Sequence, residues 1–292
     1  IEELKEDKDI DSILWIGEPG TVGLKGVASV LTGEVSPSGH LPDTYAVSSV
    51  SSPAMANFGN YTFTNATEKN FGASNYSGSN YVVESEGIYT GYKYYETRYE
   101  DTVLKQGNAD SEAGASGDNG SWNYDSEVSY GFGYGLSYTT FEQNIKNFDY
   151  SGDNVTLSVE VTNTGDAAGK DVVQLYAQTP YTDYDKENNV EKASVQLIGF
   201  EKTKELKPGE SETVEVSAPK EYFASYDYKT AKTYIMDAGD YYFAIGNGAH
   251  EALNNILAAR GYTTADGMDA DGNKDLAVSH KEDSLDTTTY AM

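Results

Sequence analysis

Carboxylate side chains at two places in the sequence have surroundings that acid–base or ligand-binding chemistry would use. Glu18 follows a short apolar run, Ser12–Gly17, and would lie at the carboxyl end of a buried strand, where α/β proteins bind ligands. Glu84 and Glu86 flank Ser85, so an extended chain would place both carboxylates on one face. Simpler roles compete with these: a solvated loop charge or a helix N-terminal charge for Glu18, and water-facing charges for the other two.

Tyrosines crowd the segment YVVESEGIYTGYKYYETRYE (Tyr81–Glu100), which its aromatic and alternating polar residues predict to be extended. Tyr89, Tyr92, Tyr94 and Tyr95 have flat faces that could stack on a sugar ring. The favoured interpretation is that these side chains pack a junction between two parts of the chain.

One acidic segment and the three histidines are the candidates for metal ligands. DADGNKD (Asp269–Asp275) resembles the start of a calcium loop, which needs Gly at its sixth position and Glu at its twelfth. Those positions hold Lys274 and His280, so the motif fails. His40, His250 and His280 have no ligand spacing, and we expect surface histidines, no metal and no cofactor.

Composition narrows the classes of partner. The formal net charge is −27, from 47 acidic and 20 basic residues, which repels phosphate backbones and anionic lipids. We therefore expect no nucleic-acid partner and no membrane partner. The chain has no cysteine, which excludes disulfides, thiolate nucleophiles and cysteine-based zinc sites, and it leaves the compartment open.

The N-terminal part predicts an incomplete α/β layer. The apolar run Ser12–Gly17 predicts a strand buried on both faces of a parallel sheet, and TVGLKGVASVLTG predicts a helix that ends at Gly33. A parallel sheet needs several such units, and only one is visible. Because the chain also opens on charged residues without an initiator Met, we expect an internal fragment. Irregular loops are expected over Ala46–Asn80 and Gly107–Ser121.

The second half predicts a β-sandwich of the fibronectin type III or immunoglobulin class. Short strands separated by turns are predicted over Asn154–Gly165, Asp171–Pro180, Ala193–Lys202 and Glu212–Pro219, followed by a hairpin over Lys232–Gly248 that turns at Asp237–Asp240. A helix is predicted over His250–Gly261, because Ala252, Leu253, Ile256 and Leu257 form one stripe. The acidic tail that follows predicts a linker.

Several motifs together resemble the C-terminal half of glycoside hydrolase family 3. They are WIGEPGTVGLKGVASVLTGEVSPSGHLPDTY, EGIYTGYKYYE, YGFGYGLSYTTF, and VTNTGDAAGKDVVQLYAQTPY followed by LIGFEKTKELKPGES, in the family's order and over roughly Asp11–Gly248. His40 stands where the family usually has Arg, and Gly131 where it usually has Pro, which puts only the local geometry in doubt.

The resemblance implies a mainly β fold: a fibronectin type III-like sandwich preceded by part of an α/β sandwich. We expect residues 1–140 to be the end of the α/β sandwich domain, 141–248 the fibronectin-like domain, and 249–292 a helix and linker. The family's (β/α)8-like barrel, with its nucleophilic Asp, has no counterpart. The Glu that commonly serves as acid/base precedes the counterpart of SILWIG and is also absent, so no catalytic residue is assigned.

Two functional hypotheses follow. In the first, the chain is a non-catalytic C-terminal piece of a retaining β-glucosidase-like enzyme that hydrolyses terminal β-linked sugars. Its partners would be the missing barrel of the same polypeptide, before or after this segment, and the β-glucoside or oligosaccharide substrate. In the second, it is a free-standing fibronectin-like module that binds carbohydrate or acts as a spacer. In the first, YGFGYGLSYTTF would be mainly a structural seam between the two domains. The alternative is that its aromatic rings form a platform for a sugar.

Overall fold

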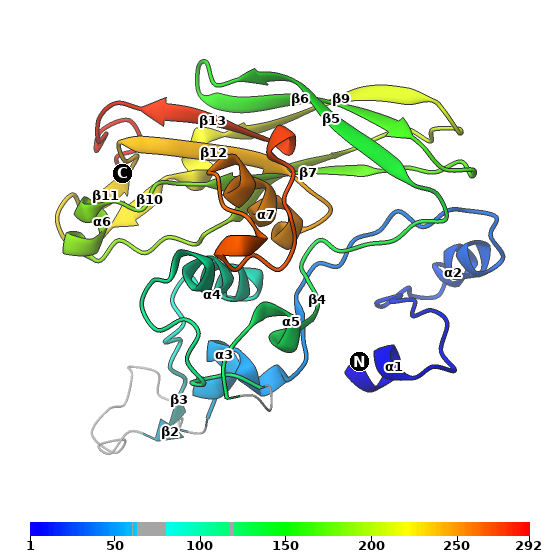
Figure 1. Cartoon of the computed structure of the whole chain (residues 1–292), viewed down its shortest axis with the longest axis horizontal. Helices are drawn as coiled ribbons and strands as arrows, with labels where there is room; N and C mark the ends of the chain where they lie inside the picture. The colour runs from blue at the N-terminus through cyan, green and yellow to red at the C-terminus, as the bar shows by residue number, and fades with distance from the viewer. Residues whose placement is uncertain (60, 63–79, 117–119) are drawn as a thin grey trace, which may run out of the picture.

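The computed structural model describes residues 1–59, 61–62, 80–116 and 120–292. The fold is mainly β, as the sequence predicts, with a fibronectin type III-like sandwich in the second half. Figure 1 shows helix α7 (Ala249–Ala259) between the sandwich and helix α4 (Tyr92–Leu104). Helices α1 (Glu2–Glu6) and α2 (Leu24–Leu31) lie apart on one side.

The sandwich is built from two antiparallel sheets. One has the order β5-β6-β9, with β5 at Phe141–Asp149, β6 at Asn154–Asn163 and β9 at Ser211–Pro219. The other has the order β13-β12-β7-β8, with β13 at Ala277–Glu282, β12 at Gly239–Ile245, β7 at Val172–Gln178 and β8 at Gln196–Lys202. The strands predicted over residues 154–219 are therefore confirmed.

Alternation of side chains builds the sandwich core. Val155, Leu157, Val159 and Val161 of β6 are fully buried, and the residues between them are partly exposed. They pack with residues of the facing sheet, Phe243 among them. β7 is instead buried on both faces, because α7 and α4 cover the face that turns away from this core.

The predictions for the C-terminal part are partly wrong. The hairpin with its turn at Asp237–Asp240 does not form: β11 (Thr233–Ile235) pairs with β10 (Ser225–Asp227), and β12 pairs with β7 and β13. The tail is not a linker, because β13 completes the sheet along β12. The helix predicted over His250–Gly261 is confirmed as α7.

The N-terminal βα unit forms only in part. Helix α2 (Leu24–Leu31) is confirmed, and Gly33 follows it with a φ of +74°. The strand predicted at Ser12–Gly17 is wrong, since this run has no strand structure and pairs with no described strand. Ile13, Leu14, Trp15 and Ile16 are 39–52% exposed. A strand needs a hydrogen-bonded neighbour, and the described residues supply none here.

The prediction of extended structure over Tyr81–Glu100 is wrong from Tyr92 onward, where α4 begins. Tyr95, Tyr99 and Val103 recur every four residues and are all buried, which is a helical period. The many tyrosines and threonines favour strands by propensity, but the buried face decides the structure.

The remaining elements are short. They are α1 (Glu2–Glu6), β1 (Tyr45–Ala46), η1 (Ser49–Ser51), α3 (Pro53–Asn57), β2 (Tyr61–Thr62), β3 (Asn80–Tyr81), α5 (Tyr124–Glu127), β4 (Val128–Tyr130), α6 (Asp183–Asn188), η2 (Lys220–Phe223), η3 (Thr264–Asp266) and η4 (Lys274–Leu276). The loops predicted over Ala46–Asn80 and Gly107–Ser121 fall partly outside the described residues. Within the described chain, no helix has the length and apolar character to cross a membrane.

Candidate functional site

The two halves of the chain meet at a second hydrophobic core, which we call the seam. It joins side chains of α4 and the segment before β4 to α7 and to the outer face of the sandwich. Its buried members are Tyr95, Tyr99, Val103, Trp122, Tyr124, Val128, Tyr176, Val195, Ala244, Ala249, Ala252, Leu253, Ile256, Leu257 and Met268. Functional side chains at this place are therefore held by both halves together.

The glycine-rich segment YGFGYGLSYTTF runs through the seam. Gly133 has a φ of +82°, and a Cβ atom there would lie 2.4 Å from Gln174 Oε1 and 2.8 Å from Gly248 Cα. The Phe132 carbonyl accepts a hydrogen bond from the amide of Ala249 at 3.0 Å, and the Phe132 ring stacks on Tyr92 at 4.3 Å between centroids. Glycine is needed here because the backbone passes so close to the neighbouring strand and helix.

His40 also lies at the seam. The Gly133 carbonyl accepts hydrogen bonds from His40 Nδ1 at 2.7 Å and from Gln174 Nε2 at 3.0 Å. The histidine at the place usually held by arginine in the family thus fastens the loop before β1 to the glycine-rich segment.

A polar group within the seam is the candidate site that best combines titratable side chains. We call Glu96, Tyr99, Tyr124, His250 and Asp269 the seam cluster. His250 lies between two carboxylates, with Nδ1 2.8 Å from Glu96 Oε2 and Nε2 2.7 Å from Asp269 Oδ2. Tyr124 donates to Glu96 Oε1 at 2.6 Å and stacks on the imidazole at 3.6 Å between centroids. Tyr99 donates to Asp269 at 2.9 Å.

The charges of the seam cluster fix its chemistry. Burial by itself lowers the pKa of His250, but Glu96 and Asp269 outweigh that effect and raise the pKa to about 10. Burial also acts to raise the pKa of Asp269, and the bonds from His250 and its other neighbours lower it to about 2. The imidazole is therefore an imidazolium at neutral pH. A general acid for glycoside hydrolysis needs a carboxyl with a raised pKa, and that of Asp269 is lowered. The hydrogen bonds around His250 fit a structural role in which they hold the two halves together.

The tyrosines that could have stacked on a sugar pack the seam and its surroundings instead. Tyr89 donates to the Lys192 carbonyl at 3.2 Å, and the Tyr92 hydroxyl accepts from the Leu197 amide at 3.1 Å. The Tyr94 hydroxyl accepts from Arg98, while Tyr95 is buried against Ser51.

The predicted carboxylate candidates do not come together. Glu18 is exposed in the irregular stretch before α2. Glu84 is exposed and Glu86 half-buried, and a turn over 85–88 removes the strand that would have aligned them.

The calcium-loop-like residues and the remaining histidine have other roles. Asp269 belongs to the seam cluster, whereas Asp271 and Asp275 line an open cavity of about 370 Å³ beside the end of α7. His280 stacks on Tyr150 at 3.7 Å. No group of three or more histidine or carboxylate ligands suited to a metal occurs among the described residues.

Sequence reasoning missed the polar residues of α4. Glu100 is buried and forms an ion pair with Arg260 and a 3.0 Å hydrogen bond with Gln178. Burial raises the pKa of the neighbouring Asp101 to about 6. The spacing of Glu96 and Glu100, one helical turn apart, is the signal that could have found them, but the aromatic and alternating polar residues of the segment predict an extended chain. His250, expected at the surface, is instead only 21% exposed at its side chain.

Family profiles and known proteins match both halves of this architecture. The profile described as "Glycosyl hydrolase family 3 C-terminal domain" matches residues 1–138, and that described as "Fibronectin type III-like domain" matches residues 171–249. A "Beta-glucosidase" of Ruminococcus albus is 32% identical over 83% of this chain and 21% of its own length. "Beta-glucosidase A" of Butyrivibrio fibrisolvens is 31% identical over 85% of this chain and 26% of its own length.

Solved structures agree with these relatives. A β-glucosidase from Paenibacillus barengoltzii superposes with a TM-score of 0.58 at 33% identity, over 78% of this chain and 20% of that one. β-Glucosidase 3B from Thermotoga neapolitana superposes with a TM-score of 0.53 at 31% identity, over 76% of this chain and 24% of that one. The chain thus spans a fifth to a quarter of the length of these relatives. It belongs to glycoside hydrolase family 3, of which it holds the end of the α/β sandwich domain and the fibronectin type III-like domain.

Proposed function

We propose that this chain is the non-catalytic C-terminal portion of a retaining β-glucosidase that hydrolyses terminal β-linked sugars. Residues 1–140 complete an α/β sandwich domain, residues 141–248 form the fibronectin-like domain, and no residue of the chain is a catalytic acid or nucleophile. The chain serves as scaffold for the barrel and contributes to the rim of its pocket. The similarity to β-glucosidases, each about four times as long, supports this proposal.

The observation that carries the proposal is the exposed apolar run before α2. Ile13, Leu14, Trp15 and Ile16 are 39–52% exposed, although such a run is typical of a strand buried on both faces. Val22, just before α2, is 82% exposed, and Leu24 and Leu31 at the two ends of α2 are 59% and 68% exposed. Large apolar side chains that are exposed this close together in the sequence indicate an interaction site. Its occupant in the proposal is the rest of the α/β sandwich, which would supply the missing strands.

This part of the proposal is tested by association. The coding sequence on either side of these residues is read first, and a barrel and further α/β strands are expected there. The remaining part of the polypeptide, produced separately, should bind this chain in a calorimeter, and Trp15→Asp should abolish binding. Phe200→Asp, which replaces another exposed aromatic side chain far from the run in sequence and changes the net charge by the same amount, is the matched control. Stop codons at both ends of the coding sequence would overturn the proposal.

A second function, carbohydrate binding by a free-standing module, is favoured by a different observation. Tyrosines are exposed on the β10–β11 hairpin: Tyr226 (47%), Tyr228 (58%) and Tyr234 (37%). Tyr226 and Tyr234 face each other across the two strands, with ring centroids 5.2 Å apart. Exposed aromatic faces suit sugar rings. Binding of cello-oligosaccharides that is lost in Tyr226→Ala and Tyr228→Ala would support this function, and no binding at millimolar ligand would refute it.

A further inference from the structure

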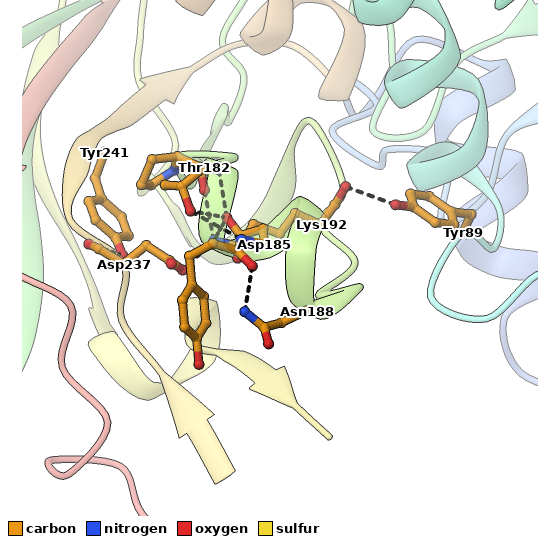
Figure 2. A network of polar contacts seen from close by, with 9 residues as sticks. Tyr89, Thr182, Asp185, Asn188, Lys192, Asp237 and Tyr241 are labelled. Atoms are coloured by element: carbon orange, nitrogen blue, oxygen red, sulfur yellow. Dashed lines mark hydrogen bonds and ion pairs between the residues drawn. The ribbon is translucent and has the colours of Figure 1, made fainter. Parts of the chain in front are cut away.

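The fibronectin-like domain contains a buried Lys–Asp–Asp cluster that plays no part in the proposed function. Lys192 lies just before β8, Asp185 on α6, and Asp237 just before β12. Their side chains are 3%, 0% and 2% exposed. Figure 2 shows the three converging from separate segments of the domain.

The contacts of the lysine define the geometry of this cluster. Lys192 Nζ is in direct hydrogen-bonding contact with Asp237 Oδ2, lies 3.1 Å from Asp185 Oδ2, and donates to the Pro180 carbonyl at 2.7 Å. Asp185 Oδ2 is held in place by the amide and hydroxyl of Thr182 at 2.6 and 2.9 Å. Asp185 Oδ1 is buried and has no hydrogen-bond partner among the described residues.

Charge makes this arrangement costly as an ion cluster. Two carboxylates and one ammonium give a net charge of −1 at a place where the side chains are at most 3% exposed, and each buried ion loses hydration. Burial raises the pKa of Asp237, although Lys192 acts in the opposite direction. Protonation of Asp237 makes the cluster neutral. It also leaves one carboxyl in its acid form, which is the electrophilic one.

We infer that Lys192 and Asp237 are joined by an intramolecular isopeptide bond that forms spontaneously after folding, with Asp185 as the proton acceptor. The reacting groups are buried together and fixed by three segments of the fold, and such fixed proximity gives intramolecular reactions very high effective concentrations. No cofactor, oxidant or reductant is required.

The step balances in atoms and charge. The Lys192 ammonium gives one proton to the Asp185 carboxylate, and the freed electron pair of Nζ attacks Cγ of the protonated Asp237 carboxyl. The new C–N bond forms and one C–O bond breaks. That oxygen leaves as water with its own proton and a second proton from Nζ. The products are a neutral amide, a neutral Asp185 carboxyl and one water molecule.

The hydrogen bonds of the cluster also suit the product. The amide keeps one N–H, which can still donate to the Pro180 carbonyl. The protonated Asp185 can donate to the new amide carbonyl, and Thr182 still donates to Asp185 Oδ2. The bond would join the loop between β7 and β8 to the start of β12. In the sheet, β7 lies between β8 and β12 and pairs with both.

Intact-mass spectrometry of the purified, folded chain is the test. The chain should be lighter than its sequence mass by one water molecule. After trypsin digestion, residues 187–202, uncut at Lys192, should be joined to residues 233–260. A full sequence mass, with Lys192 cleaved, would overturn the inference. So would a water loss that maps to the Asp266–Gly267 or Asp271–Gly272 steps, where a succinimide can form.

Variants separate the roles of the groups. Lys192→Arg keeps a cation and should restore the full mass, whereas Lys146→Arg, at an exposed ion pair with Glu160, should keep the deficit. Asp237→Asn should be lighter than its own sequence mass by ammonia in place of water. Asp185→Asn should slow bond formation in refolded chain. A deficit that persists in Lys192→Arg would overturn the assignment, and the wild-type measurement decides the matter even if a variant fails to fold.

Discussion

His250 is the residue whose replacement tests the seam most sharply. Its imidazolium is the bridge between Glu96, which is fully buried, and Asp269, whose side chain is 20% exposed. His250→Gln removes the positive charge and leaves two carboxylates near each other at the boundary of the two halves. We expect the free energy of unfolding to fall at neutral pH.

The magnitude follows from two arguments. Removing one partner of a buried ion pair costs about 3–5 kcal/mol. A pKa raised from 6.5 to about 10 corresponds to at most about 5 kcal/mol, at roughly 1.4 kcal/mol per tenfold change in proton affinity. Because Asp269 is partly solvated, we expect about 3 kcal/mol at pH 7.

The pH dependence has a definite sign. The folded pKa of His250 lies above its unfolded value, so this stabilisation is complete below about pH 6.5 and is lost as the pH rises through about 10. The difference in stability between wild type and His250→Gln should therefore shrink to under about 1 kcal/mol at pH 10.5.

Urea unfolding followed by tryptophan fluorescence is the assay. The chain has two tryptophans: Trp122 is buried in the seam and Trp15 is 52% exposed, so a Trp15→Phe background leaves Trp122 as the reporter. His280→Gln is the matched control, since His280 is 36% exposed and 3.5 Å from Glu282, and should cost under about 1 kcal/mol. A loss of less than about 1 kcal/mol for His250→Gln at pH 7, or a difference that does not change up to pH 10.5, would refute the reasoning.

Further predictions concern the seam and the sheet. Gly133→Ala should lower the free energy of unfolding by about 3 kcal/mol or more, because the new Cβ would lie 2.4 Å from Gln174 Oε1. Gly209→Ala, at a φ of +77° with no atom within 4 Å of the new Cβ, should lower it by about 1 kcal/mol. Equal losses in urea unfolding would contradict this prediction. Phe132→Ala should cost about 2 kcal/mol through loss of its stack on Tyr92, and an unchanged stability with a raised Michaelis constant in the longer enzyme would favour a sugar platform instead. In hydrogen exchange, the amides of residues 13–16 should exchange fast and those of Tyr99 and Val103 slowly, and fast exchange throughout α4 would show that the seam is not formed.

The sandwich strands could be predicted because their information is local. In β6, alternate valines and leucines specify the buried face, and turn residues mark the ends. The strand at residues 12–17 was predicted from the same local signal and does not form, because a parallel strand depends on neighbours that the described chain lacks. α4 was missed because the strand propensity of its tyrosines concealed a period of four residues.

The seam cluster could not be predicted from the sequence for a different reason. Glu96 and His250 are 154 residues apart, and nothing in either neighbourhood indicates the other. The acidic composition of the tail predicts a linker, whereas in the fold the tail pairs with the open edge of β12 as β13. Pairing between distant segments is decided by the assembled fold, and only the family resemblance of the ordered motifs indicated which two domains would meet.

The central claim is that this chain is a scaffold without the catalytic carboxylates, and hydrolysis of a chromogenic aryl β-glucoside tests it most directly. The purified chain should release no aglycone above the buffer rate. The polypeptide extended by its flanking coding sequence should hydrolyse the substrate with retention of configuration. Turnover by the chain alone at the rate of the extended polypeptide would contradict the claim.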